Sequence, residues 1–95
     1  MYAAPIQKTV ATEGARIYCE YRGRGPLLLL ITGAMEDAGF YSSAADILSG
    51  KFTVLSYDRR CNSRSSGDRS ADMTVAQQAR DAAAIIKAMG ADHAV

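Results

Sequence analysis

A run of five large aliphatic residues limits the possible folds of this chain more than any other feature. Residues 27–31 read Leu-Leu-Leu-Leu-Ile, between Pro26 and the pair Thr32 and Gly33. As a strand this run has no polar face, so both of its faces must be covered, which is typical of a parallel sheet between helices. A membrane-spanning helix needs about 20 apolar residues, so the run is too short to be one. We therefore expect a central parallel strand, with ligand contacts in the loop from Gly33 to Gly39, because ligands bind at the carboxyl ends of such strands.

Two short strands are predicted before this run. Ile6 to Val10 reads as a weakly alternating strand, and the polar residues 11–14 read as a turn near Gly14. Residues 16–22 then alternate, with an apolar face formed by Ile17, Cys19 and Tyr21 and a solvated polar face. The two strands are expected to pair as an antiparallel hairpin that leads into the aliphatic strand.

A short helix and a further strand are predicted after the Gly33 loop. The sequence from 52 to 57 is rich in β-forming residues, and a strand, helix, strand unit of this kind is nearly always a parallel crossover. Gly50 is placed to end the helix. The helix is expected to bury the apolar stripe Phe40, Ala44, Ile47 and Leu48.

Residues 59–73 form a long polar loop, and long loops are often functional or mobile. Thr74 and Gln77 then match a capping box at the start of a helix that runs as far as Gly90. Another strand begins at Ala94. The predicted buried face of the helix consists of Val75, Ala79, Ala82, Ala83, Ile86 and Met89.

Composition and charge narrow the function classes. The net charge is only +1 and there is no basic block, so no nucleic-acid partner is expected. No signal peptide or membrane segment is recognisable, and Cys19 and Cys61 lack the spacing of a zinc site or a disulfide framework. We therefore expect a cytoplasmic protein with no membrane partner, no metal and no organic cofactor. The oligomeric state is left open.

The order of these elements and two of their motifs resemble the N-terminal part of the α/β-hydrolase superfamily. In that family the third strand commonly ends in His-Gly before an oxyanion loop, and the fourth ends in a pattern such as Asp-x-Arg-Gly-x-Gly-x-Ser. Residues 57–65 here read Tyr-Asp-Arg-Arg-Cys-Asn-Ser-Arg-Ser, so Asp58, Arg60 and Ser65 match the second pattern. The resemblance runs from about Thr12 to the last residue. It implies a three-layer α/β sandwich in which an antiparallel hairpin leads into parallel strands with crossover helices.

Three residues depart from the family pattern. Thr32 stands where the family usually has His, and Cys61 and Ser63 stand where glycines are usual. Glycine at those two places permits a positive φ, so Cys and Ser would strain the turn unless the loop follows another path. Asn62, which tolerates the left-handed conformation, is expected to take up part of the bend.

The resemblance also implies a division of the active site. Backbone N–H groups of Ala34 and Met35, after Gly33, are the expected oxyanion-hole donors, with a simple strand-to-helix turn as the alternative. The family's nucleophile elbow, GxSxG, follows the fifth strand, and its acid and His come later, so no catalytic residue is expected within this chain. Residues 1–95 are therefore expected to form one incomplete domain that ends at the start of the nucleophile strand. A polypeptide of these residues alone should expose an apolar strand edge and aggregate.

Other candidate residues are expected to have structural rather than catalytic roles. Glu36 and Asp37 are expected to cap or to face solvent rather than to form an acid/base pair. Asp58 is expected to brace its loop through backbone or Arg hydrogen bonds, together with Gly33, Arg60 and Ser65 as structural loop residues. His93 belongs to a turn or to the surface, because the family's His follows the nucleophile.

The thiols and the loop serines receive similar assignments. Cys19 lies on the apolar face of its strand and is expected in the core. Cys61 with Arg64 could suggest a thiolate phosphatase loop, but no helix N-terminus follows directly to hold an anion. The serines of the loop, which are expected to form turns because no His is near them in sequence, are Ser63, Ser65 and Ser66.

The sequence therefore predicts the N-terminal portion of an α/β hydrolase, acting on an ester or another small hydrophobic substrate through a triad beyond residue 95. Two alternatives stay open. One is a small doubly wound binding module that holds an anionic ligand at the Gly33 loop. The other is a non-catalytic protein that keeps the hydrolase fold.

Overall fold

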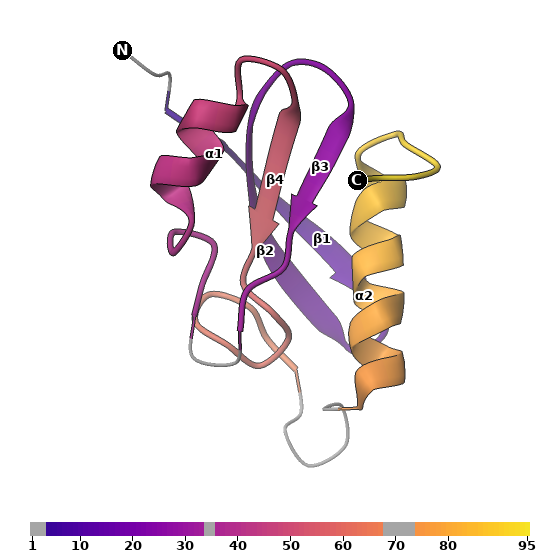
Figure 1. The fold of residues 1–95 in the computed structure, drawn as a ribbon. Coiled ribbons are helices and arrows are strands. Elements are labelled where there is room, and N and C mark those ends of the chain that lie inside the picture. Colours follow the sequence, from indigo (N-terminus) through magenta and orange to yellow (C-terminus); the bar gives the residue numbers. More distant parts are fainter. Residues whose placement is uncertain (1–3, 34–35, 68–73) are drawn as a thin grey trace.

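A computed structural model of the chain describes residues 4–33, 36–67 and 74–95. Figure 1 shows a sheet with one helix on each side. No helix in the described ranges is long and apolar enough to cross a membrane. The elements are β1 (Ile6–Thr12), β2 (Ala15–Gly23), β3 (Leu27–Leu30), α1 (Ser42–Leu48), β4 (Thr53–Tyr57) and α2 (Val75–Ala88).

The strands form one mixed sheet in the order β1-β2-β4-β3. β1 and β2 pair as the predicted antiparallel hairpin around Gly14, which has a φ of 72°. β2 also pairs antiparallel with β4, and β3 pairs parallel with β4 through the α1 connection. With α1 on one face of the sheet and α2 on the other (Figure 1), the predicted three-layer α/β architecture is confirmed.

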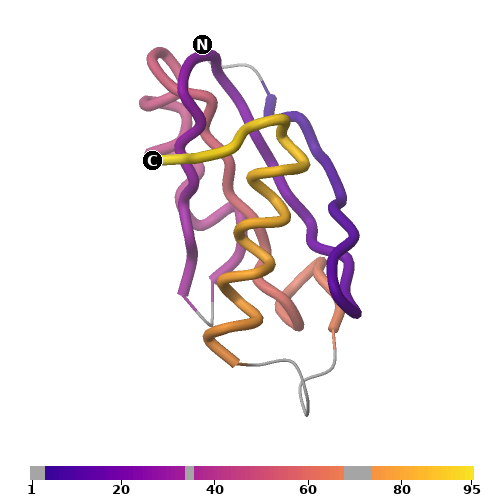
Figure 2. The backbone as a smooth tube through the Cα atoms, turned by 90° about the vertical axis from the view of Figure 1, so that its right-hand side faces the viewer, coloured from indigo at the N-terminus to yellow at the C-terminus, as the bar shows by residue number. Residues whose placement is uncertain are grey.

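The C-terminal end of the chain returns to the sheet beside β3, as Figure 2 shows. The amide of Val95 donates to the carbonyl of Leu27 at 2.9 Å, and the amide of Leu29 donates to the carbonyl of Val95 at 3.1 Å. This pair of bonds is the pattern of a parallel ladder. Val95 thus lies beside β3 on the side away from β4, and the strand predicted to begin at Ala94 stays a prediction. The four leucines of β3 are only half-buried among the described residues, whereas the sequence predicted full cover.

The hydrophobic core lies between the sheet and α2. Cys19 is fully buried in it, as predicted, and burial is the main cause that raises the pKa of its thiol to about 12, with a smaller contribution from the charge of Asp58. The thiol is therefore protonated and inert at neutral pH. The buried members of this core are Val10, Ala15, Ile17, Cys19, Leu55, Tyr57 and Ile85.

Helix α2 buries a different face from the one predicted. Its buried residues are Gln77, Asp81 and Ile85, while Val75 is 85% exposed. The N-cap is as predicted, because the Thr74 hydroxyl accepts a hydrogen bond from the Gln77 amide at 3.0 Å. The Gln77 side chain, however, donates to Asp81 and does not complete the capping box. Hydrogen bonding to buried polar groups, rather than an alanine stripe, decides which side of this helix faces the sheet.

Helix α1 also differs from its prediction. It begins only at Ser42 and its buried residue is Ala45, whereas Phe40 and Ile47, both in the predicted stripe, are 59% and 71% exposed. Gly50 is not among the residues with positive φ, so it is not a left-handed cap.

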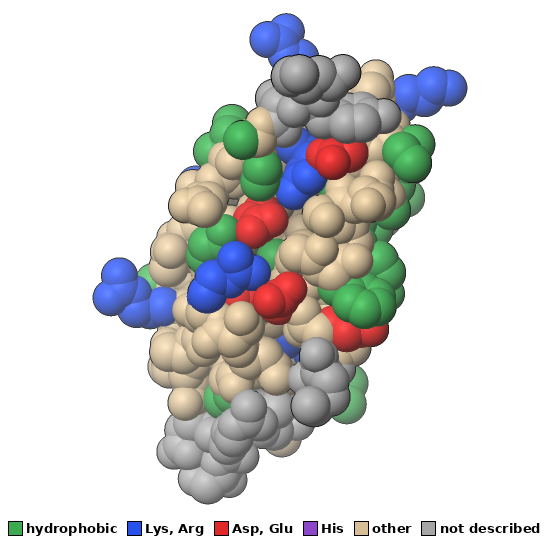
Figure 3. Space-filling view, turned by 90° about the vertical axis from the view of Figure 1, so that its left-hand side faces the viewer, with side chains coloured by type: hydrophobic (Ala, Val, Ile, Leu, Met, Phe, Trp, Pro, Cys, Tyr) green, Lys and Arg blue, Asp and Glu red, His purple; other side chains and the backbone are tan. Residues whose placement is uncertain are grey.

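The polar face of β2 is buried, although the sequence predicted that it would be solvated. Glu20 and Arg22 are both 8% exposed. Arg22 pairs with Asp46 of α1 at 2.6 Å, and Glu20 accepts from Arg64 at 3.3 Å. Figure 3 views the molecule from the α1 side, where acidic and basic side chains lie next to one another. Ion pairing with segments distant in sequence makes burial of these side chains tolerable.

Gly23 is a backbone position where any side chain should destabilise the fold. It ends β2 with a φ of 89°, and a Cβ there would meet the carbonyl oxygen of Phe52 and lie 2.5 Å from that of Ser49. We expect Gly23→Ala to lower the free energy of unfolding by about 2 kcal/mol or more, from strain and overpacking together. Gly50→Ala is the matched control, because a Cβ there has nothing within 4 Å. Urea denaturation of both variants checks this, and an equal, small effect would contradict it.

Candidate active site

Two loops meet at the carboxyl ends of β3 and β4. The first follows β3 from Thr32, and the second follows β4 from Asp58. The Gly33 amide in the first loop donates to the Glu36 carboxylate at 2.6 Å. Ala34 and Met35, the predicted oxyanion donors, lie outside the described residues, so their placement stays a prediction. Ala38 is fully buried and contacts the residues that end β4.

The Asp58 carboxylate joins the two loops. Its Oδ1 accepts from the Ala38 amide at 2.7 Å and from Arg64 Nη2 at 3.0 Å. Its Oδ2 accepts from the Arg64 amide at 2.9 Å and from Arg64 Nε at 2.7 Å. The side chain is fully buried and all of these partners are donors. A carboxylate held in this way braces the loops and has no free position for proton transfer.

Opposing effects set the charge of Asp58. Burial acts to raise the pKa of this carboxyl, but the hydrogen bonds from the Arg64 side chain and from the Ala38 and Arg64 amides outweigh it, so the pKa lies below its usual range. The same pair raises the pKa of Arg64, chiefly through its hydrogen bond to Asp58. Both groups are therefore charged at neutral pH.

Arg64 extends this bracing to β2. Its guanidinium lies over the Tyr18 ring, 3.9 Å from the centroid, and its Nη1 contacts Glu20. The Tyr18 hydroxyl in turn donates to Glu20 at 2.9 Å. Neither Arg64 nor Glu20 was singled out as a bracing residue from sequence, although an alternation that puts Glu and Arg on one strand face opposite an Arg-rich loop could have indicated it.

Arg60 makes a second buried ion pair on the α2 side of the sheet. Its Nε donates to Asp81 Oδ2 at 2.8 Å and its Nη2 donates to Oδ1 at 2.9 Å, and both side chains are at most 1% exposed. Nη2 also donates to the carbonyl of Glu13 in the β1–β2 turn. This one side chain therefore ties the loop after β4 to α2 and to the hairpin.

Ser65 and Ser66 attach the same loop to β2. The Ser65 hydroxyl accepts from the Tyr18 amide at 2.9 Å and donates to the Asp58 carbonyl at 2.6 Å. The Ser66 hydroxyl accepts from the Arg16 amide at 2.9 Å, and the Ser66 amide donates to the Arg16 carbonyl at 3.0 Å. Residues 59–67 are thus a well-anchored part of the loop that the sequence described as functional or mobile.

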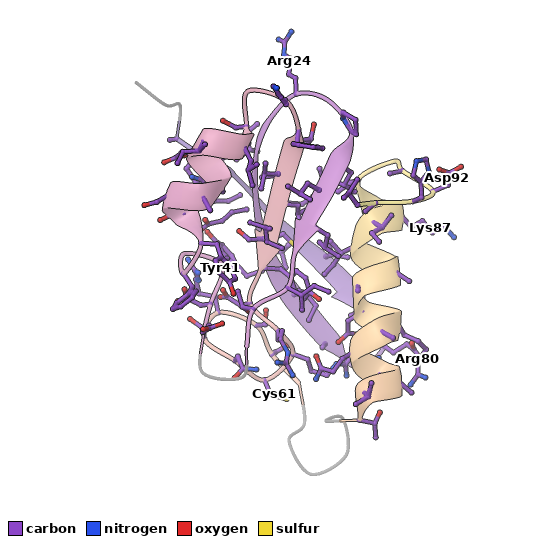
Figure 4. The ribbon with its side chains drawn as sticks, viewed as in Figure 1. Arg24, Tyr41, Cys61, Arg80, Lys87 and Asp92 are labelled. Atoms are coloured by element: carbon purple, nitrogen blue, oxygen red, sulfur yellow. The ribbon has the colours of Figure 1, made fainter. Side chains whose placement is uncertain are left out.

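The turn within this loop is strained where the sequence departs from glycine. Cys61 has a φ of 67° and Ser63 has a φ of 47°. The loop therefore takes the path that glycine would permit, and the expectation that Asn62 takes up the bend is wrong, because its φ is not positive. In Figure 4, Cys61 lies just beyond the carboxyl ends of the strands.

Relief of this strain should be measurable at Ser63, which is exposed. Ser63→Gly is expected to raise the free energy of unfolding by about 0.5–1 kcal/mol, because a left-handed conformation costs a non-glycine residue about 1–2 kcal/mol and the flexibility of glycine offsets part of that gain. Asn62→Gly is the control and should destabilise. It removes the hydrogen bond from the side-chain Nδ2 of Asn62 to the Arg60 carbonyl at 3.0 Å, and it relieves no strain because the φ of Asn62 is not positive. Thermal unfolding of both variants measures these effects. Stabilisation by both substitutions would contradict the prediction that strain is located at Ser63.

The other sequence candidates occupy peripheral positions. The Asp37 carboxylate accepts from the Gly39 amide at 2.9 Å and so caps a turn that precedes α1. Glu36 closes the Gly33 turn, so the two carboxylates have separate structural partners. The His93 side chain is 90% exposed beside Asp92.

Thr32, at the family's usual His position, is 2% exposed, and its hydroxyl has no hydrogen-bond partner among the described residues. Its carbonyl accepts from Arg59 Nη1 at 3.3 Å, which links the end of β3 to the loop after β4. The same guanidinium donates through Nε to Gln78 of α2 at 3.4 Å. Arg59 therefore joins the end of β3 to helix α2.

An open pocket of about 380 Å³ lies elsewhere, among Ala83, Ile86, Lys87, Ala91 and Asp92. Figure 4 shows Lys87 and Asp92 near the C-terminal end of α2, at the end of the molecule opposite to Cys61. None of the loop residues at the carboxyl edge lines this pocket, so the candidate site rests on loop geometry.

Comparison with known proteins agrees with this architecture. The described strands and helices superpose on an epoxide hydrolase from an endophytic Streptomyces with a TM-score of 0.90, over 97% of this chain at 26% identity. The chain has the fold of the N-terminal portion of an α/β hydrolase. A second structure, an α/β hydrolase from Sphaerobacter thermophilus DSM 20745, matches 87% of the chain at 34% identity with a TM-score of 0.79.

Sequence comparison finds similarity to a hydrolase. The chain is 42% identical over 57 residues to the uncharacterized hydrolase YraK of Bacillus subtilis (strain 168), which is 60% of this chain. No family model matches the chain. The match covers 21% of YraK, and the two structures are covered over 28% and 32% of their lengths. The chain therefore spans about a fifth to a third of the length of these relatives.

Proposed function

We propose that the intact protein is an α/β-fold hydrolase of the serine-hydrolase type, and that this chain supplies the loop that binds the oxyanion. Its substrate is an ester or another small hydrophobic compound, its location is cytoplasmic, and its nucleophile, acid and His lie beyond residue 95. Neither Cys19 nor Cys61 forms a disulfide within the described residues, which is in keeping with a reducing compartment.

The observation that carries this proposal is the attachment of the loop after β3. An oxyanion hole needs backbone donors that are fixed before charge develops. Here the loop that contains the proposed donors Ala34 and Met35 is bonded to β4 through Ala38 and to Arg59 through Thr32. Val95 is hydrogen-bonded to β3 in a parallel pattern, and a nucleophile at the carboxyl end of a strand in that position would face this loop.

The described loop residues with nucleophilic side chains are poorly suited to act as a rival nucleophile. Ser65 and Ser66 have their hydroxyls engaged with the backbone of β2, and no helix begins within residues 62–67, directly after Cys61. The only histidine, His93, is exposed on the turn after α2. These positions support a triad whose groups lie beyond residue 95.

A serine-directed fluorophosphonate and a series of p-nitrophenyl esters test the proposal on the intact protein. We expect stoichiometric labelling of a single serine beyond residue 95, loss of ester hydrolysis on labelling, and protection by substrate. A folded protein that neither reacts nor turns over any ester would contradict the proposal. Such a result would favour the binding module or the non-catalytic relative.

A second candidate is epoxide hydrolysis, because the chain matches an epoxide hydrolase with a TM-score of 0.90. Turnover of a terminal aryl epoxide to its diol, without labelling by the fluorophosphonate, would favour this candidate over the ester reaction.

A further inference from the structure

Both backbone polar groups of Ala38 are hydrogen-bonded to side chains at the end of β4 and just after it. The Ala38 amide donates to Asp58 Oδ1 at 2.7 Å, and its carbonyl accepts from the Ser56 hydroxyl at 2.9 Å. Ala38 and Asp58 are fully buried, and Ser56 is 2% exposed. Ser56 and Asp58 are two residues apart at the end of β4, so their side chains point to the same face of the sheet.

The loop after β3 is therefore fixed at each end by residues at the end of β4 or just after it. At its start, the carbonyl of Thr32 accepts from Arg59. At its other end, Ala38 is bonded to Ser56 and Asp58. The peptide plane before Ala38 cannot turn without the loss of a buried hydrogen bond to a charged acceptor, and the plane after Ala38 cannot turn without the loss of the bond from Ser56. The segment between these attachments contains Ala34 and Met35.

We propose that Ser56 and Asp58 are positioning residues that hold the oxyanion loop in its reactive geometry through Ala38. This inference rests on the proposed hydrolase function. Neither side chain is accessible to a substrate, since both are at most 2% exposed, Ser56 bonds the Ala38 carbonyl, and Asp58 accepts from Ala38 and Arg64. Their effect is on the direction of the N–H groups that stabilise a developing oxyanion.

The role of Ser56 can be separated from simple stabilisation by a matched pair of hydroxyl deletions on β4. Ser56→Ala removes the bond to Ala38. Thr53→Val removes a similar bond, from the Thr53 hydroxyl to the Gly25 carbonyl at 3.0 Å, at the opposite end of the strand. We expect Ser56→Ala to lower kcat by about tenfold or more with KM changed by less than about threefold, because displacement of a donor affects the transition state more than the ground state. Thr53→Val should leave kcat as in the wild type.

Amide hydrogen exchange of the intact protein gives a readout that needs no turnover. Ser56→Ala is expected to speed exchange across residues 36–40, and Thr53→Val is not. If the wild type is active and Ser56→Ala has the same kcat, the positioning role alone would be overturned. Unchanged exchange in Ser56→Ala would overturn the attachment itself. A folded wild-type protein without any hydrolytic activity, but with the expected exchange, would contradict the proposed function and the catalytic role of the loop, while the attachment would stand.

Discussion

Asp81→Ala is expected to lower the free energy of unfolding by about 3–5 kcal/mol, because it removes one member of a fully buried ion pair. Arg60 is itself completely buried, and it would lose both of its bonds to the Asp81 carboxylate. Gln77 and Thr12, which also donate to Asp81, would lose an acceptor as well. The loss is a large fraction of the total stability of a domain of this size, about 5–15 kcal/mol.

Glu13→Ala is the matched control for this prediction. Glu13 in the β1–β2 turn pairs with Arg80 of α2, the helix that also carries Asp81, at 2.9 Å. The side chains of Glu13 and Arg80 are 61% and 53% exposed. An exposed pair contributes at most about 1 kcal/mol. Urea denaturation followed by circular dichroism compares the two variants in the intact protein. Equal effects would show that the buried pair does not anchor α2.

Asp58→Asn is expected to cost about 2–4 kcal/mol at neutral pH. The amide nitrogen of asparagine cannot accept a hydrogen bond, so at least one buried donor at Ala38 or Arg64 loses its partner, and the charge that pairs with Arg64 is gone. Thr53→Val, at the other end of β4, again serves as the control, with an expected cost below about 1 kcal/mol.

The cost of Asp58→Asn should depend on pH. The folded-state pKa of Asp58 is depressed, so its carboxylate contributes stability above the unfolded-state pKa of about 3.9 and loses that contribution as the pH falls through the folded-state pKa. The wild type and the variant should therefore differ most at neutral pH and converge below about pH 4. Denaturation curves between pH 7 and pH 3 measure the difference, and a gap that widens in acid would refute the assignment.

The order of elements was predictable because their signals are local. The aliphatic run at residues 27–31, the turn at Gly14 and the Thr74 cap each depend on neighbouring residues, and each lies close to where it was expected. The parallel partner of β3 at Val95 followed from the crossover pattern. Together these signals were enough for the fold class.

The buried polar contacts were not predictable from local patterns. Asp81 faces inward because it meets Arg60, 21 residues away, and this contact turns α2 away from its alanine stripe. Glu20 is buried because Arg64, 44 residues away, covers it. Periodicity assigns faces by hydrophobicity alone, so it places paired charges in solvent. The role of Ser56 was missed for the same reason, since no local signal connects it with Ala38.

A crystal structure of the intact protein after reaction with a fluorophosphonate would test the central claim most directly. The adduct places a phosphonyl oxygen where the oxyanion of an ester intermediate would lie. We predict that this oxygen accepts a hydrogen bond of about 2.7–3.1 Å from the backbone N–H of Ala34 or Met35, with the Ala38 bonds to Ser56 and Asp58 intact. A phosphonyl oxygen that contacts neither amide, in a protein that hydrolyses esters, would contradict the claim that this chain provides the oxyanion loop.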